Sequence, residues 1–251
     1  MILTIASREF KTLFLSPLAW TVLAILQCIL AYIFLTQLET FNLIQPKLAA
    51  IENAPGLTDI VVTPLFGNAG IILLLVTPLL TMRVICEERR NKTLSLLLSA
   101  PVSNADIIIG KYLGILGLLL LMIFLIALMP LSLLAGGELD FGKLFANLLA
   151  LLLLVTAFTA VGLFMSTKAS HPVIAAIGTF GILLLLWILD WTTGIKDQRS
   201  ELFEYLSILR HFQNLQSGLI SSVDIGYFLL FTATFIVLSI RSLNNGRCLQ
   251  K

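Results

Sequence analysis

The sequence predicts an all-α, polytopic protein that crosses a membrane six times, and three observations lead to that fold class. Of its 251 residues, 58% are hydrophobic and only 12% are charged, and the mean hydropathy is +1.00. A soluble domain carries about 25% charged residues, so the composition excludes a soluble enzyme, a nucleic-acid-binding domain and a disordered chain. Long uncharged runs recur along the sequence. None of them alternates between polar and apolar residues as the strands of a membrane β-barrel do.

Six uncharged runs define the predicted spans. A helix needs about 20 apolar residues to cross the hydrocarbon core of a bilayer, and five runs reach that length: 12–38, 60–82, 112–137, 144–167 and 169–189. The sixth run, 225–240, is shorter. We therefore predict that the last span begins near Ser221 and that Asp224 lies at the membrane interface. Between the first two spans, residues 39–59 are expected to form an acidic connector broken by prolines.

The basic residues predict the orientation of these spans, because cytoplasmic loops carry the excess of Lys and Arg. With the N-terminus inside, eleven of the 16 Lys and Arg residues fall on the cytoplasmic side, whereas ten of the 14 acidic residues fall on the other. Both termini are therefore expected in the cytoplasm. The three cysteines lie in spans or on the cytoplasmic side, so no disulfide is expected. Their spacing does not fit a metal site.

Residues 1–15 are predicted to form an amphipathic helix that lies along the membrane surface. Apolar residues, Phe10 among them, recur at helical spacing, and polar residues that include Arg8 and Lys11 occupy the other side. Such a helix lies in the headgroup region with its cations toward anionic lipid. The alternative is that these residues are the leading end of the first span. We favour the interfacial helix, because Arg8 and Lys11 would otherwise stand just below the bilayer.

The segment 86–106, between the second and third spans, is the most informative part of the chain. It begins with a charged cluster and continues with a short apolar helix, which Pro101 ends because proline lacks an N–H and biases the preceding residue away from helix. Ser103 is then predicted to be an N-cap, with Asp106 in the first turn of the next helix. The leucines of the segment need an apolar partner, either the bilayer surface or another protein. The candidate contact residues are Glu87, Glu88, Arg89, Arg90, Thr93, Leu94, Leu97, Leu98 and Pro101.

These residues resemble a known family. The run 87–103 contains Glu-Glu-Arg-Arg, Thr-Leu, Leu-Leu and Pro-Val-Ser at the spacing of the coupling region of ABC-2 type transporter permeases, and Gly-Lys-Tyr-Leu-Gly follows at 110–114. The chain is most similar to the gliding-motility permease subfamily, with the nitrous-oxide reductase maturation permease as a close relative. Lys92 and Ser95 depart from the subfamily pattern, which commonly has Gly and an acid at these positions. The two glycines of 110–114 are spaced for close helix contact.

The resemblance implies the membrane subunit of an ATP-driven complex in the bacterial cytoplasmic (inner) membrane. Such a permease pairs with a second copy of itself or with a homologous permease. Each cytoplasmic coupling helix then sits in a groove of an ATP-binding-cassette ATPase, of which the complex holds two copies. Glu87, Glu88 and the loop leucines would transmit nucleotide-driven closure to the spans.

The same resemblance assigns the cofactors and the remaining partners. ATP and magnesium belong to the ATPase, because this sequence contains no Gly-x-x-x-x-Gly-Lys-Ser/Thr phosphate loop. We therefore expect that the chain itself is not an enzyme. A periplasmic or membrane accessory protein and the lipid bilayer complete the expected partners, and nucleic acid is not among them.

The segment 191–222, before the last span, predicts external amphipathic helices. Its apolar residues repeat at steps of three and four. In the resembled family, short external helices dip back into the outer leaflet and help close the pathway, which makes Leu209, His211 and Phe212 candidates for an outer gate. A surface helix without a gating role is the alternative. His211 has no other metal-ligating residue at ligand spacing, so we interpret it as an ordinary histidine on the polar face and expect no metal site.

Other classes of membrane protein agree less well with the sequence. An ion-coupled secondary transporter usually carries ionisable residues within the bilayer and often shows internal repeats, whereas the five longer runs are uncharged. An intramembrane enzyme would need a nucleophile with a base, or a metal cluster, inside the membrane. A non-transporting scaffold that acts mechanically on periplasmic partners remains an alternative to export.

Overall fold

The structure is a computed structural model that describes residues 1–48, 56–90, 103–135, 139–193 and 205–248. Helices make up nearly all of these residues, and no strand occurs among them. Six helical stretches in these ranges are long and apolar enough to cross a membrane: Pro17–Lys47, Thr58–Arg90, Asn104–Ser132, Phe141–Lys168, Pro172–Leu189 and Ser222–Asn244. The all-α fold with six spanning helices is therefore confirmed.

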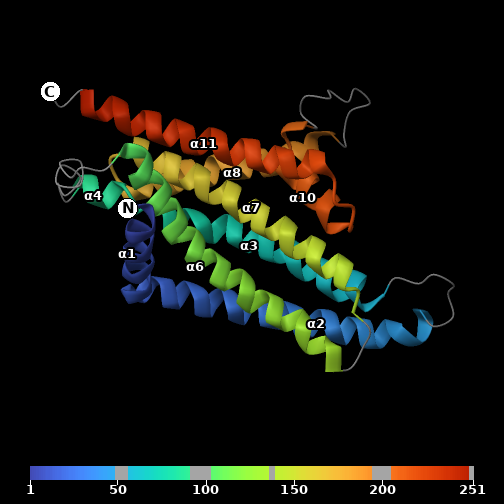
Figure 1. Cartoon of the computed structure of the whole chain (residues 1–251). Helices are drawn as coiled ribbons and strands as arrows, with labels where there is room; N and C mark the ends of the chain where they lie inside the picture. Colours follow the sequence, from blue (N-terminus) through green and yellow to red (C-terminus); the bar gives the residue numbers. More distant parts are fainter. Residues whose placement is uncertain (49–55, 91–102, 136–138, 194–204, 249–251) are drawn as a thin grey trace.

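The long helices share one general direction, and the shorter ones lie at the two ends (Figure 1). Toward one end lie α1 (Ile2–Leu15) and α4 (Cys86–Arg90), and toward the other lies α10 (Ile208–Gln216). The long helices are α2 (Pro17–Leu48), α3 (Thr63–Thr81), α6 (Asn104–Ser132), α7 (Phe141–Lys168), α8 (Pro172–Thr193) and α11 (Ser222–Cys248).

Helix α7 forms the centre of the bundle. It packs against α3, α6, α8, α10 and α11, and 67% of its most apolar stretch is buried inside the protein. Small residues allow this packing, as is usual where helices meet in a membrane. Ala157 and Ala160 are fully buried, and Gly162 lies so close to Thr81 of α3 that a Cβ there would overlap the threonine side chain. The position of α7 therefore sets the positions of the helices around it.

The connector predicted at 39–59 is wrong for residues 39–48, because α2 continues through them to Leu48. Glu39 does not end the helix, and Pro46 lies in the last turn, where its missing N–H removes only one of the final backbone bonds. At the end of the predicted connector, the π-helix η1 (Thr58–Val62) leads into α3. Residues 49–55 lie outside the described residues.

Two predicted helix starts are confirmed. The Ser103 hydroxyl accepts the N–H of Asp106 at 3.0 Å, and the Asp106 carboxylate accepts the N–H of Ser103 at 3.3 Å, which is a capping box. Helix α11 begins at Ser222 and places Asp224 in its first turn. A short 3-10 helix, η2 (Leu133–Ala135), follows α6.

Candidate functional site

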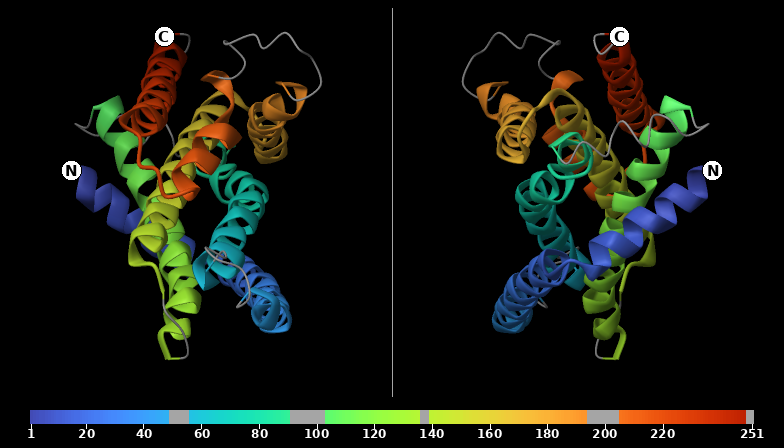
Figure 2. Two further views of the ribbon diagram at one scale, coloured as in Figure 1. Left: turned by 90° about the vertical axis from the view of Figure 1, so that its right-hand side faces the viewer. Right: turned by 90° about the vertical axis from the view of Figure 1, so that its left-hand side faces the viewer.

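The first helix is separate from the first span. Helix α1 ends at Leu15, Ser16 is extended with ψ of 127°, and Pro17 opens α2. Trp20 of α2 fixes this elbow, because its ring N–H donates to the carbonyl of Phe14 at 2.8 Å and its ring meets the Phe14 ring edge-on. Figure 2 shows α1 crossing α6, the helix on which it packs. The prediction of a separate amphipathic helix at 1–15 is confirmed.

Glycines on α6 allow α1 to lie close to it. A Cβ at Gly110 would come within 2.8 Å of Ile5, and one at Gly114 would come within 2.6 Å of the Cβ of Glu9. Real Cβ atoms essentially never approach other heavy atoms closer than 3.0 Å. Gly117 continues the same contact, with a Cβ position 3.0 Å from the ring of Phe10. The close helix contact predicted from the glycine spacing is therefore confirmed, and its partner is α1.

A buried lysine joins three elements at this end of the bundle. Lys111 of α6 is only 1% exposed. Its ammonium donates to the carboxylate of Glu9 on α1 at 2.5 Å and to that of Glu88 on α4 at 2.8 Å. A third bond runs to the carbonyl of Val84, in the turn between α3 and α4, at 3.0 Å. One cation therefore bonds to α1, to α4 and to the turn that precedes α4.

The start of α4 is also fastened to the end of α7. The hydroxyl of Ser166 accepts the N–H groups of Ile85 and Cys86 at 3.1 and 3.2 Å. The guanidinium of Arg89 donates to the carbonyl of Thr167 at 2.8 Å, where it satisfies a carbonyl at the C-terminus of α7. We call the whole set the α4 junction: Glu9, Val84, Ile85, Cys86, Glu88, Arg89, Lys111, Ser166 and Thr167.

The α4 junction is built to hold its parts in a fixed arrangement. It contains two cations, two carboxylates and backbone groups that are bonded to one another, and the described residues contain no cluster that could hold a metal ion. A buried charge is stable only when it is paired and hydrogen-bonded, so a movement of α4 must carry Lys111 with it or break these bonds. The contacts of the junction therefore connect the helices mechanically.

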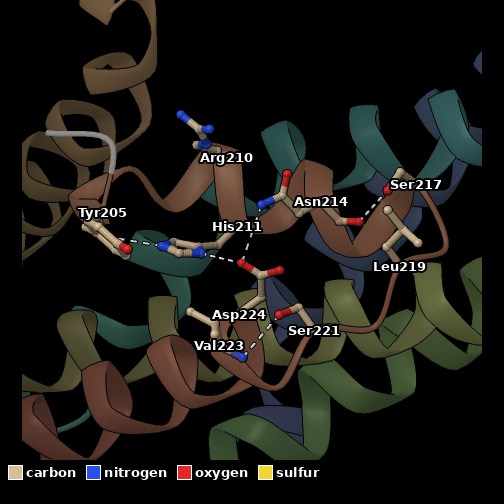
Figure 3. Close-up of a pocket in the computed structure, with 9 residues that line it drawn as sticks. All are labelled: Tyr205, Arg210, His211, Asn214, Ser217, Leu219, Ser221, Val223 and Asp224. Atoms are coloured by element: carbon tan, nitrogen blue, oxygen red, sulfur yellow. Dashed lines mark hydrogen bonds and ion pairs between the residues drawn. The ribbon is translucent and has the colours of Figure 1, made fainter. Parts of the chain in front are cut away.

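The opposite end carries a second set of paired polar groups, centred on α10 (Figure 3). Nδ1 of His211 lies 2.5 Å from the carboxylate of Asp224 on α11, and Nε2 lies 3.2 Å from the carbonyl of Tyr205. The imidazole stacks on the ring of Tyr227, with centroids 4.1 Å apart. His211 and Asp224 are 5% and 4% exposed. Beside them is a cavity of about 620 Å³, whose lining includes Arg210 and Asn214.

Apolar and amide contacts seat α10 on the bundle. Phe212 is 1% exposed and packs against the ring of Trp187 on α8, with centroids 6.2 Å apart. Gly70 of α3 makes room for the ring of Phe212. Asn147 of α7 donates to the carbonyl of Gln216 at 3.4 Å. We call residues 205–216 the α10 cap.

The structure places some predicted site residues and leaves others outside its described range. Of the candidate loop residues, Glu87 pairs with Arg83 at 3.4 Å and is half-exposed, Arg90 is exposed, and Glu88 and Arg89 belong to the α4 junction. Glu88 therefore faces inward. The rest lie outside the described residues: Thr93, Leu94, Leu97, Leu98 and Pro101. The coupling role of the loop stays a prediction.

The residues expected at the two ends are placed as follows. Arg8 and Lys11 are exposed on α1, whereas Phe10 is half-buried against α6. Leu209 and Phe212 belong to the apolar contacts of the α10 cap. The interpretation of His211 as a polar-face histidine is wrong, because it is buried and pairs with Asp224.

Sequence reasoning missed three residues that organise these two sites. Lys111 was seen only as part of a motif, although a lysine inside the start of an otherwise apolar helix is itself a signal of a buried partner. For Asp224, the sequence predicts a position at the membrane interface and indicates no partner. Ser166 gave no signal, because a serine in a span usually bonds to its own helix, and its contact with the turn before α4 depends on the packing of α3 against α7.

Comparisons with known proteins identify the family. Curated proteins gave no match. The chain does match the model of one family, described as ABC-2 family transporter protein, over residues 3–245. This match covers nearly the whole sequence and all six candidate spans. The chain therefore belongs to the ABC-2 family of transporter proteins and is a multi-pass permease component of an ABC transporter.

Proposed function

We propose that this chain works with a separate ATP-binding-cassette ATPase and that the loop 86–106 is the contact between the two. Membership of the ABC-2 family supports an ATP-binding-cassette ATPase as the partner. The α4 junction supports the loop 86–106 as the place of contact. The loop begins at α4, whose residues bond to the central helix α7 and, through Lys111, to α6 and α1. A force applied to the loop would therefore act directly on the helix around which the bundle is packed. This fastening is the observation that carries the proposal.

The loop would bind the ATPase through its apolar residues. Leu94, Leu97 and Leu98 follow the charged cluster at helical spacing, and an apolar helix in a groove is a common mode of docking. Half-exposed Glu87 and exposed Arg90 lie at the start of the loop and would form a charged rim that sets the register. ATP and magnesium would be bound by the ATPase.

The excess of cations supports the orientation of this complex. Eleven of 16 basic residues fall on the side of α4 and of both chain ends, so we assign that side to the cytoplasm of a bacterial inner membrane. The α10 cap would then lie outside, where Leu209, His211 and Phe212 would contribute to an outer gate. The full complex would hold two ATPase subunits and two permeases, with the second permease identical or homologous. An accessory membrane or periplasmic protein is compatible with it.

Copurification from the native host tests the proposal. An affinity-tagged chain should bring down an ATP-binding-cassette ATPase that hydrolyses ATP. The double variant Leu94→Asp/Leu97→Asp should lose both the bound ATPase and the ATP hydrolysis, because two carboxylates cannot enter an apolar groove without a large desolvation cost. The matched control Gln213→Asp, an exposed change on α10, should keep both. Full association in the double variant would exclude the loop as the contact, and a parent chain without an ATPase would contradict the function.

A further inference from the structure

The imidazole of His211 lies between two hydrogen-bond acceptors. Its Nδ1 faces the carboxylate of Asp224 at 2.5 Å, and its Nε2 faces the backbone carbonyl of Tyr205 at 3.2 Å. A neutral imidazole has one N–H and one lone pair. If His211 were neutral and Asp224 ionised, one nitrogen lone pair would point at an oxygen lone pair. The two contacts are satisfied together only when an additional proton is present.

The surroundings favour the placement of that proton on the imidazole. The Asp224 oxygen that faces His211 also accepts from the amide of Asn214 at 3.5 Å, as an ionised carboxylate does. The imidazole lies nearly parallel to the ring of Tyr227, at 22° and 4.1 Å between centroids. The face of an aromatic ring attracts a cation. Each of these contacts stabilises an imidazolium beside a carboxylate.

We propose that His211 and Asp224 form a proton-binding site that is reached from the adjoining cavity, and that the bound proton holds the α10 cap against α11. The cavity supplies the route, since both residues contribute to its lining. The pair joins α10 to the first turn of α11. This inference concerns the chain alone and does not depend on a partner ATPase.

The other charged groups near the pair are few in the described part of the chain. On α10 itself, Arg210 lines the cavity. On α11, the neighbours are Asp224 and the phenol of Tyr227, whose hydroxyl donates to the carbonyl of Leu206 at 3.0 Å. Lys143 of α7, which lies near the end of α10, is paired with Asp59 of η1 at 2.6 Å. The described side chains of α8 include no acid or base.

Loss of the proton has a defined structural result. Whichever nitrogen keeps its hydrogen, the other turns a lone pair toward an oxygen, so one of the two bonds becomes a repulsion. If Nδ1 keeps the hydrogen, the segment at Tyr205 is released. If Nε2 keeps it, α10 is released from Asp224. In both cases an acidic outer solution closes the cap and an alkaline one loosens it.

The protonation state can be read directly, because the chain contains only two histidines. The permease is labelled with ¹⁵N-histidine, placed in lipid nanodiscs and examined by solid-state NMR at about pH 8, where an exposed imidazole is neutral. Exposed His171 serves as the internal reference, and His171→Gln assigns the signals. We expect two protonated ring nitrogens for His211 and one for His171. A neutral His211 would overturn the proposal.

Movement of the cap is measured with two spin-label pairs at exposed positions: Leu206→Cys with Thr234→Cys reports on the segment at Tyr205, and Gln213→Cys with Thr234→Cys reports on α10. Cys28 and Cys248 are replaced by serine, and Cys86 is kept because it is buried. We expect narrow distance distributions at about pH 5, and a broad one for at least one pair at the alkaline pH at which the NMR spectrum shows a neutral His211. Asp224→Asn should lose this response, whereas His171→Gln should keep it.

Unchanged distributions for both label pairs in the parent chain, or a response that His171→Gln abolishes, would overturn the proposal. If Asp224→Asn fails to fold, the parent chain and the His171→Gln control still decide the question, because neither alters the proposed site.

Discussion

At the scale of single residues, the fold depends on polar groups that cannot be removed one at a time. Lys111 lies between Glu9 and Glu88 and pairs with both carboxylates. Removing one partner from a buried ion pair costs about 3–5 kcal/mol, because the remaining charge stays buried without compensation. Here the removal of Lys111 would leave two carboxylates facing each other, so repulsion adds to the cost of burial.

The variant Lys111→Met should therefore destabilise the protein strongly, by about 3–5 kcal/mol in free energy of unfolding. Lys111→Arg should recover part of this loss, because it keeps the cation. SDS titration in mixed micelles gives the free energy. The matched control is Arg83→Gln, which breaks the half-exposed pair with Glu87 and should cost about 0–1 kcal/mol. Equal effects for Lys111→Met and Arg83→Gln would contradict the geometry of the junction.

Ser166 offers a neutral test of the same region. Its replacement by alanine leaves the N–H groups of Ile85 and Cys86 without their acceptor. An unsatisfied buried donor costs about 1–3 kcal/mol, so Ser166→Ala should lower the free energy of unfolding by that amount. The control is Ser132→Ala, since the Ser132 hydroxyl is exposed and bonds only within its own helix. A stability like that of the control would mean that water replaces Ser166.

At the scale of elements, α1 is held by shape as well as by charge. The α6 glycines bring the two backbones together, and the ion pair between Glu9 and Lys111 fixes the position of α1 along α6. Part of the apolar side of α1 that the sequence assigned to lipid is therefore in contact with protein. Periodicity showed that this side exists, but it could not show which surface covers it.

Substitution of Gly114 by alanine should displace α1, since its Cβ would meet Glu9 at 2.6 Å. A spin label at Ser7→Cys, which is exposed, should gain mobility. Gly226→Ala is the matched control, because nothing lies within 4 Å of its Cβ position. That change should stabilise the protein slightly, since alanine is preferred to glycine in a helix by about 1 kcal/mol. Equal label mobility in the two variants would contradict the close packing of α1.

At the scale of the whole molecule, local and long-range features differ in how far the sequence predicts them. The six spans and the Ser103–Asp106 capping box depend on neighbouring residues, so composition and spacing were enough. The pairing of His211 with Asp224 and that of Lys111 with Glu9 depend on which faces of separate helices meet. The extension of α2 through Glu39 was missed because a charged residue can continue a helix beyond the membrane.

Labelling with a membrane-impermeant thiol reagent tests the proposed orientation. In a background with Cys28 and Cys248 replaced by serine, Gln213→Cys on α10 should react in intact cells. Ser7→Cys on α1 should react only after the cells are permeabilised, because the cationic side is expected inside. Both positions are exposed, so access to the side chain is equal. The reverse pattern would invert the assignment of the two faces.

The length of α2 has a consequence for the membrane around the protein. Its 32 residues extend for about 48 Å at 1.5 Å per residue, whereas the hydrocarbon core of a bilayer is about 30 Å thick. A helix with such a mismatch either tilts or projects from the membrane. Only 22% of the most apolar stretch of α2 is buried, against 67% for α7, so its neighbours restrain it much less than they restrain α7. The inclination of α2 should therefore follow bilayer thickness, so that this long helix responds to lipid composition while the buried α7 keeps its place.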